Sequence, residues 1–429
     1  MKSPNQKLLV FIFIVFFSSF IARAQLSERH WIPPIHTVDR NSNPAIGVDE
    51  QFLYLSTPEA AAFAVTITDG AGNPIPGSPF TLSNATPVRI NLGTGVNTYV
   101  STSQNDLNRP LAFNRGLILT ASESFYANLR LSSDIHSATI SSKGSIGLGT
   151  DFRLGSFPQE QIDNGNGFFA SVMATENNTV VTINGYDTNV TFEDNVGTIS
   201  PNVITATLNA GESYVVAGRH GTAANLDGFV GARVTATNPI AVSTGTMLGK
   251  TSDVTNGGRD MGMDQIVPTN LVGTEYITIR GNGLDFNENV LVVATANSTQ
   301  IRVNGATAPI ATINAGDYYL IQGNNYNGVV GHENMYIETS APTYVYQILA
   351  GDGSSDSRSE ATQGMSFIPP LNCNLLKSIN FISAIDEIGP INFVSNVLLT
   401  TRAGAIVTVN GGAPNGTPRA VLGLSLIHI

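Results

Sequence analysis

The sequence is poor in the residues that support disulfides, charged surfaces and membrane anchors. Cys373 is the one cysteine in 429 residues, so no intramolecular disulfide can form and stability must come from packing. Charged residues make up only 12% of the chain. No apolar run after the first segment is long enough to cross a bilayer. These absences exclude a disulfide scaffold and a multispanning membrane protein.

The residue patterns of common enzymes are also missing. The six histidines form neither an H-x-x-x-H nor an H-E-x-x-H pattern, and no G-x-S-x-G motif occurs. No nucleophile and base, and no pair of carboxylates, can be identified from their spacing. The sequence therefore predicts that the protein is not an enzyme and that it holds no cofactor and no metal ion.

Residues 1–24 have the pattern of a secretory signal peptide. A basic start is followed by an apolar run, and Ala24 ends a stretch of small residues that suits cleavage before Gln25. An uncleaved anchor is the alternative, but the run is short for it. Removal of three cations with this segment would lower the net charge from −11 to −14. An acidic surface argues against nucleic acid as a partner, so we expect a secreted or surface protein with no membrane span in the mature chain.

What the chain has in abundance is repetition. The segment 174–185 returns with conservative changes at 294–305, and it begins again at 400–411. Alternating apolar residues followed by Asn-Gly predict a strand and a tight turn. A second shared pattern, at 207–216 and 312–321, predicts strand, turn and strand around an Asn-Ala-Gly-acid sequence.

These repeats divide the chain into units. We expect unit 1 at 25–148, unit 2 at 149–269, unit 3 at 270–370 and an incomplete unit 4 at 371–423. Each complete unit reads as six or seven short strands without a convincing helix. The predicted fold is all-β, with tandem antiparallel β-sandwich-like units of about 100–120 residues. The alternative is a β-propeller-like arrangement of the repeats.

Two boundary features complete this division. The Pro239 and Pro342 segments are each expected to form a turn between two strands, where the missing N–H costs no ladder bond. Residues 424–429 equal the translation of a sequencing-adapter sequence, and we expect them to be an artefact at the end of a fragment. A genuine final strand is the alternative.

Several longer motifs resemble a known family. They lie at 27–34, 52–58, 171–179, 257–267 and 363–371. The chain is similar to the IgGFc-binding protein N-terminal domain, as found in secreted, gliding-motility-associated proteins of Bacteroidota. The resemblance implies export by type IX secretion and a role in binding outside the cell. It carries over no individual ligand-contacting residue.

Two loops are the candidate ligand-binding segments. Arg219 and His220 lie in the loop that follows the second turn motif in unit 2, and Asn324, Asn325 and Tyr326 lie in the equivalent loop of unit 3. Loops on rigid β scaffolds commonly carry binding residues. We expect Tyr326 to be exposed, because a polar, glycine-rich loop offers little to bury it.

Together these features predict an adhesion or ligand-binding protein that acts outside the cell. Its expected partner is an extracellular glycan or protein surface, held through tandem weak sites. One alternative is a structural stalk that presents a further domain. A secreted hydrolase is a remote alternative, since carboxylates that meet only in the fold would escape a search by spacing.

Overall fold

The fold consists almost entirely of antiparallel β-structure. The computed structural model describes residues 25–36, 50–111, 115–133, 136–251, 259–281, 283–329, 333–349, 363–371, 384–392, 399–402, 405–409, 411–414, 421–422 and 427–428. Within these ranges the one α-helix is α1 (Ala224–Asp227), and short 3-10 turns are η1 (Gln104–Asp106), η2 (Gly144–Gly147), η3 (Thr269–Leu271) and η4 (Gly323–Asn325). The predicted all-β class is confirmed.

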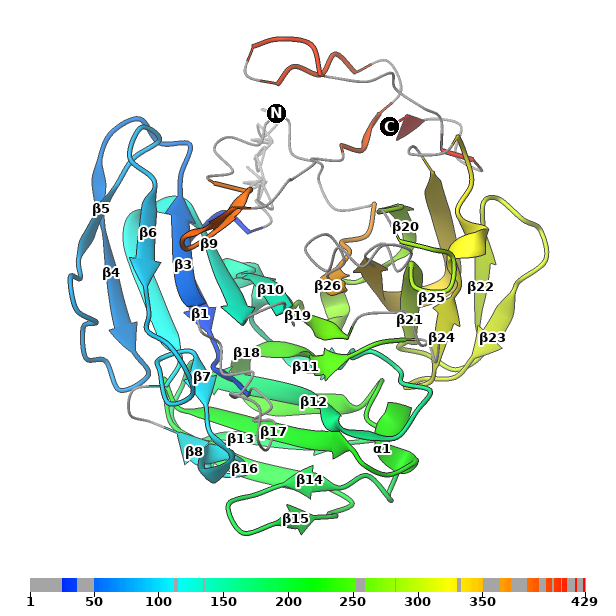
Figure 1. The fold of residues 1–429 in the computed structure, drawn as a ribbon, viewed down its shortest axis with the longest axis horizontal. Coiled ribbons are helices and arrows are strands. Elements are labelled where there is room, and N and C mark those ends of the chain that lie inside the picture. The colour runs from blue at the N-terminus through cyan, green and yellow to red at the C-terminus, as the bar shows by residue number, and fades with distance from the viewer. Residues whose placement is uncertain are drawn as a thin grey trace, which may run out of the picture.

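Three large sheets follow one another along the chain (Figure 1). Sheet 1 contains β1 (Ser27–Ile32), β3 (Glu50–Ser56), β4 (Phe63–Asp69), β5 (Phe80–Leu82), β6 (Val88–Asn91), β9 (Leu117–Ser133) and β10 (His136–Ser141). Sheet 2 contains β8 (Pro110–Leu111), β11 (Gly149–Arg153), β12 (Asp163–Ala174), β13 (Thr179–Asn184), β16 (Ile204–Leu208), β17 (Ser213–His220), β18 (Arg233–Gly249) and β19 (Asp260–Ile266). Sheet 3 contains β20 (Gly273–Ile279), β21 (Asn289–Ala294), β22 (Thr299–Val303), β23 (Ala311–Ile313), β24 (Tyr318–Ile321), β25 (Asn334–Leu349) and β26 (Gly364–Phe367).

Four small two-stranded sheets complete the strands of the described ranges. They are β2 (Ile35–His36) with β7 (Ser101–Thr102), β14 (Phe192–Glu193) with β15 (Thr198–Ile199), β27 (Glu387–Ile388) with β28 (Ile391–Asn392), and β29 (Thr401–Arg402) with β30 (Ile427–His428). Of the expected adapter residues 424–429, only those of β30 are described. Cys373 and Ala24 lie outside the described residues.

Each large sheet is organised around one long, bent strand. The first half of β9 pairs with β1 and β4, and its second half pairs with β3 and β10. The first half of β18 pairs with β11 and β13, and its second half pairs with β12 and β19. In the same way, the first half of β25 pairs with β20 and β22, and its second half pairs with β21 and β26. Each sheet therefore folds over its own core as a nearly closed, barrel-like layer pair.

The prolines lie at the bends of these long strands. The expectation that Pro239 and Pro342 form turns between separate strands is wrong, because each lies inside one continuous strand, β18 or β25. The bend comes where the long strand exchanges one partner for another: β13 pairs with β18 up to Ala236, and β12 pairs with it from Ile240. A residue without an N–H fits such a point, since no ladder bond is lost there.

The repeated sequence motifs form the same local structures in sheets 2 and 3. Asn178 and Ser298 both have a positive φ, of 58° and 57°, in the turn that leads into β13 or β22. Just before them, Asn177 accepts a hydrogen bond from the Ala210 amide at 3.0 Å. In sheet 3 the Ala315 amide donates in the same way to Asn297 Oδ1 at 3.1 Å. The two repeated motifs thus contact each other within each sheet.

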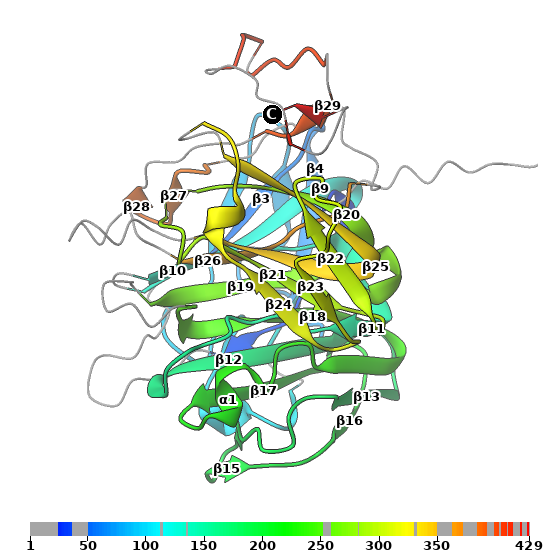
Figure 2. The same cartoon turned by 90° about the vertical axis from the view of Figure 1, so that its right-hand side faces the viewer.

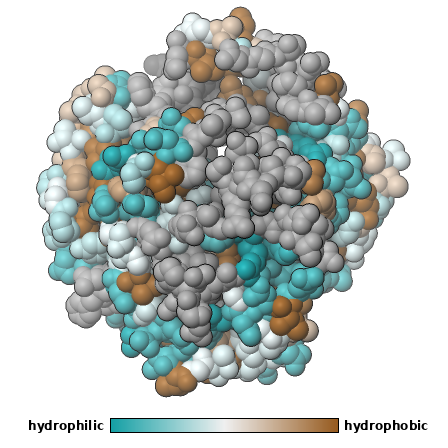
Figure 3. Space-filling view, in the orientation of Figure 1, coloured by the Kyte–Doolittle hydropathy of each residue, from teal (hydrophilic) through white to brown (hydrophobic). Residues whose placement is uncertain are grey.

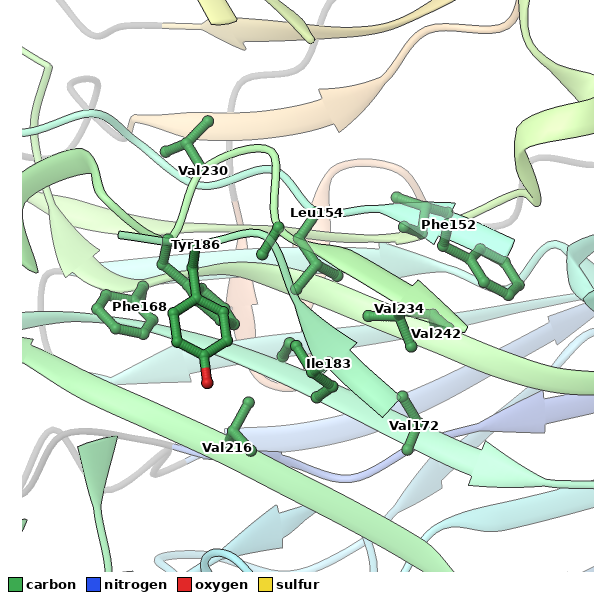
Figure 4. Packing of buried hydrophobic residues seen from close by; sticks show 14 of the residues in the cluster. Phe152, Leu154, Phe168, Val172, Ile183, Tyr186, Val216, Val230, Val234 and Val242 are labelled. Carbon is green, nitrogen blue, oxygen red and sulfur yellow. The ribbon is translucent and has the colours of Figure 1, made fainter. Parts of the chain in front are cut away.

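The cores of neighbouring sheets interlock. On β12, Phe168 and Val172 point into the core of sheet 2 (Figure 4), whereas Phe169 belongs to the core of sheet 1. Tyr346, on β25, belongs to the core of sheet 2. Burial on both faces explains why β12 is buried without a break from Asn166 to Ala174 and lacks the alternation typical of a half-exposed strand.

The three sheets surround a set of inner strands. β19 contacts β10 of sheet 1 and β26 of sheet 3, and all three lie near the middle of the view in Figure 1. In the perpendicular view β12, β17 and β18 run side by side across sheet 2 (Figure 2). The arrangement around a centre agrees with the propeller-like alternative, while each sheet encloses a core of its own. The unit boundaries expected at 149 and 270 stay predictions.

Candidate binding surface

The expectation that Arg219 and His220 lie in a loop is wrong, because both belong to the end of strand β17, and only one of them reaches solvent. A quarter of the Arg219 side chain is exposed, whereas His220 is 1% exposed and lies against the Phe168 ring. Burial, opposed in part by nearby Asp163, lowers the pKa of His220 to about 3. The imidazole is therefore neutral at physiological pH and belongs to the interior. Of this pair, Arg219 is the residue placed to meet a ligand.

Arg219 is held in position by a buried carboxylate. Its Nε donates to Glu193 Oε1 at 2.6 Å, and its NH1 donates to the Asn164 carbonyl at 3.2 Å. His36 Nε2 lies 3.7 Å from the second carboxylate oxygen of Glu193. Burial works to raise the pKa of Glu193, but the nearby His36 ring and the hydrogen-bonded Arg219 guanidinium hold it below its usual value. Glu193 is therefore ionised and anchors the guanidinium.

The strand that carries Glu193 is in turn supported by the connection between β7 and β8. Asn108, in the connection between β7 and β8, donates from its side-chain amide to the Glu193 carbonyl. Gln104, in η1, donates to the carbonyl of Asp194 at 3.2 Å. Arg219 thus stands where sheet 2 meets the small β2–β7 sheet and the connection that follows it. Sequence reasoning missed Glu193 and His36, because no local pattern links residues so far apart in the chain.

The second candidate loop contains η4 and follows β24. Asn324 is exposed, and half-buried Asn325 donates from Nδ2 to the Gln322 carbonyl at 3.0 Å. Asn304 Nδ2 donates to the Asn325 carbonyl at 2.7 Å and fixes the loop against the turn after β22. The two asparagine side chains therefore stand at the surface of a loop whose backbone is restrained.

Tyr326 does not stand exposed in this loop, so that expectation is wrong. It is 8% exposed and packs in the core of sheet 3 with Val290 and Met335. Burial raises the pKa of its hydroxyl. The physical reason is that η4 turns the chain back toward the sheet, so the ring fills space at the open end of the core. The other tyrosines of this region include Tyr344 and Tyr346, which are fully buried.

The two candidate loops belong to different sheets, at equivalent places after β17 and β24. A side-chain contact links the first of these loops to sheet 3: Tyr318 on β24 donates from its hydroxyl to Asp227 Oδ2 at 2.7 Å. Asp227 lies in α1, within the connection that begins after His220. The loop of sheet 2 therefore also serves as a contact between sheets.

The motif at 257–267 has a structural role in the part that is described. On β19, Asp264 receives hydrogen bonds from Lys143 Nζ at 2.9 Å and from the backbone amide of Phe367 at 3.0 Å. Gln265 donates to the Trp31 carbonyl at 2.7 Å. These contacts join β19 to sheet 1 on one side and to sheet 3 on the other. The motif therefore maintains the arrangement of the sheets.

A second acidic residue of β19 lies against the last strand of sheet 1. Asp260 Oδ1 accepts the amide of Ser137 at 3.0 Å and lies 3.6 Å from His136 Nδ1. Burial raises the pKa of Asp260 to about 6, although the nearby His136 ring and the hydrogen bonds from backbone amides oppose this. A carboxyl group with such a pKa titrates near physiological pH, and here it does so inside an interface between sheets.

In the described ranges, no three His, Cys, Asp or Glu side chains come together as a metal-binding group. None of the helices described has the length and apolar character needed to cross a lipid bilayer. Gln25, the residue expected after signal cleavage, has a positive φ of 68°.

Comparison with known proteins identifies a family. The family model described as IgGFc binding protein matches residues 137–424, which is more than half of the chain and includes sheet 3 and all of sheet 2 except β8. No curated protein and no solved structure gives a significant match. On the extent of the family match, the chain belongs to the IgGFc binding protein family.

Proposed function

We propose that this chain is an extracellular adhesion or ligand-binding protein without catalytic activity. The observation that carries the proposal is the family match over residues 137–424, since the family is described by binding to an antibody segment. The immunoglobulin Fc region is therefore the first ligand to test, and other extracellular proteins and glycans follow. The expected signal peptide at 1–24 and the resemblance to secreted Bacteroidota proteins support export, with attachment at the cell surface.

The proposed contact residues are Arg219, Asn324 and Asn325. The Arg219 guanidinium is held by its hydrogen bonds to Glu193 and Asn164. The loop that carries the two asparagines is fixed by the bond from Asn304 to the Asn325 carbonyl. A guanidinium anchored by a carboxylate loses little conformational freedom when it binds carboxylate or hydroxyl groups of a ligand. Exposed amides add donors and acceptors of the kind that glycans and polar protein surfaces require.

The character of the surface supports polar recognition. On the face shown in Figure 3, the coloured apolar residues are scattered among hydrophilic ones, without one dominant apolar patch. Exposed apolar side chains such as Val196, 86% exposed, stand singly at a hairpin tip. Weak polar sites on tandem sheets would gain strength from simultaneous engagement of a multivalent ligand.

The proposal is tested by retention of the purified chain on immobilised Fc fragment, mucin and a glycan panel. We expect Arg219→Ala, and the double variant Asn324→Ala with Asn325→Ala, to weaken binding on the order of tenfold. Matched controls are Arg302→Ala and Asn202→Ala, which change half-buried and exposed residues outside the two loops. Retention that is equal in all variants, or absent on every surface, would contradict the proposal. Absence on every surface would favour the structural stalk.

A further inference from the structure

The contacts between successive sheets follow one rule. In sheets 2 and 3, some strands pair with the second half of the long bent strand. The outward side chains of these strands pack on the preceding sheet. Phe169 of β12 lies in the core of sheet 1, and Leu291 of β21 lies in the core of sheet 2. The long strands β18 and β25 contribute to the same interfaces, for example through Tyr346.

Sheet 1 has an outer face that corresponds to the one carrying Phe169 in sheet 2. The strand register identifies which residues of sheet 1 occupy the corresponding positions. Leu55 pairs with Ala127 as Val172 pairs with Val242, so Phe52 takes the position of Phe169. In β3 the outward side chains are Phe52 and Tyr54, and beside them Arg89 and Arg130 extend from β6 and β9. Arg130 stacks 3.9 Å from the centre of the Tyr54 ring, and Arg89 stacks 5.7 Å from that of Phe52.

A segment near the other end of the chain covers this face. Arg89 NH1 lies 2.9 Å from Glu387 Oε1 and donates to the Gly389 carbonyl at 2.9 Å. Arg130 NH1 donates to the Glu387 carbonyl at 2.9 Å and to that of Ala384. The Gly389 amide donates to the Tyr54 hydroxyl at 2.8 Å. Figure 1 shows the β27–β28 hairpin beside β3 and β9.

Gly389 fits closely against the aromatic ring below it. Its φ is +57°, and a Cβ built at this residue would lie 2.2 Å from Cε2 of Phe52. Ile388, next to it in the hairpin, is 7% exposed. The contact between sheet 1 and the hairpin therefore combines apolar packing with specific hydrogen bonds.

The same C-terminal part of the chain also contacts sheet 3. Val421 is 2% exposed and packs on Ile277 and Tyr336, the outward residues of a pair between β20 and β25. The corresponding outward pair in sheet 1, Trp31 and Ile118, packs on Met173 of sheet 2. Val421 therefore occupies the place that a following sheet takes elsewhere in the molecule.

We propose that the described C-terminal segments 384–392 and 421–422 close the three sheets into a ring, with the outer face of sheet 1 as the docking surface for this chain's own hairpin 384–392. The docking surface consists of Phe52, Tyr54, Arg89 and Arg130. Two cations meet one carboxylate and several carbonyl oxygens there, which gives the surface electrostatic complementarity to this segment. Closure of the ring is independent of the proposed ligand-binding function.

The first test compares two glycine variants by hydrogen–deuterium exchange of the full chain. Gly389→Ala places a methyl group against Phe52 and should speed amide exchange in 50–56 and 384–392 at least about tenfold. Gly411→Ala is the matched control, because Gly411 also has a positive φ, +79°, but no atom within 4 Å of its Cβ position. It should leave both segments unchanged. Unchanged exchange in Gly389→Ala would overturn the proposal.

The second test is a charge exchange between the two partners. Arg89→Glu and Glu387→Arg should each speed exchange in the same segments, and the double variant should restore protection. Independent effects of the two changes would count against docking of this hairpin. Protection that rises with protein concentration would show that the surface takes the hairpin of a second copy, and would overturn closure within one chain.

Discussion

Lys143 and Asp264 form a buried ion pair across the interface between sheets 1 and 2, with Nζ 2.9 Å from Oδ2. Their side chains are 5% and 6% exposed. The same carboxylate accepts the amides of Ser141 in sheet 1 and Phe367 in sheet 3. One aspartate therefore meets donors from all three sheets.

We expect Asp264→Ala to lower the free energy of unfolding by about 3–5 kcal/mol, because it leaves a buried ammonium group without its partner. Denaturant titration of the purified variant measures this change. Asp151→Ala is the control: Asp151 pairs with Arg233 at 2.9 Å, but both side chains are more than a third exposed. That change should cost less than about 1 kcal/mol. Equal effects of the two changes would contradict the role given to Asp264.

Stability should fall as the pH decreases from about 6.5 to 4. Burial lowers the pKa of His30 to about 4 and that of His220 to about 3, so the unfolded chain binds protons on both before the folded chain does. Burial raises the pKa of Asp260 to about 6, which acts in the opposite direction between its ordinary pKa of 3.8 and 6. The net slope between pH 4 and 6 is one proton, on the order of 1.4 kcal/mol per pH unit.

Unfolding titrations at several pH values measure this slope. Replacing His220 by Gln should flatten it between pH 4 and 6, whereas replacing Asp260 by Asn should steepen it. A stability that is constant from pH 6.5 to 4 would show that these groups are not buried as described.

The close approach of sheets 1 and 2 at Gly211 predicts a large cost for one methyl group. Gly211 has a φ of +83°, and a Cβ there would lie 2.0 Å from the carbonyl oxygen of Gly70. Gly185 has a φ of +73° but no atom nearer than 3.8 Å to its Cβ position. Gly185→Ala should cost about 1–2 kcal/mol from backbone strain alone. Gly211→Ala should cost about 1–3 kcal/mol more because of the clash, measured by denaturant unfolding.

Truncation of Phe169 should loosen a sheet to which it does not belong. We expect Phe169→Ala to cost about 3–5 kcal/mol and to speed amide exchange in strands β4 and β9 of sheet 1. Val180→Ala, on the neighbouring strand β13, changes a side chain that is 36% exposed and should have little effect. Faster exchange confined to sheet 2 would be the contrary result.

Much of the local structure could be predicted from the sequence. Alternation before Asn184-Gly185 and Asn304-Gly305 predicts the strands β13 and β22, and the Asn-Ala-Gly-acid sequences predict the turns before β17 and β24. These features depend on neighbouring residues, which is the range over which turn chemistry and periodicity act.

The contacts between sheets could not be predicted in the same way. The pairs Lys143–Asp264 and Arg89–Glu387 join residues 121 and 298 positions apart, and nothing near either residue identifies its partner. Tyr326 shows the same limit, since its polar loop gives no sign that the ring enters a core. One useful indication was present in residues 168–174 of β12, where only Ser171 is polar and the lack of strict alternation is typical of a strand covered on both faces.

The shared cores have a mechanical consequence. In a protein whose modules have separate cores, the modules unfold one at a time under tension, and the least stable module unfolds at the lowest force. Here, pulling one sheet away would strip Phe169 or Tyr346 out of its neighbour, so the interfaces and the modules should fail together. Stretching single molecules between the ends of the chain should therefore give one large unfolding event in the force–extension curve. Independent modules would give several smaller events.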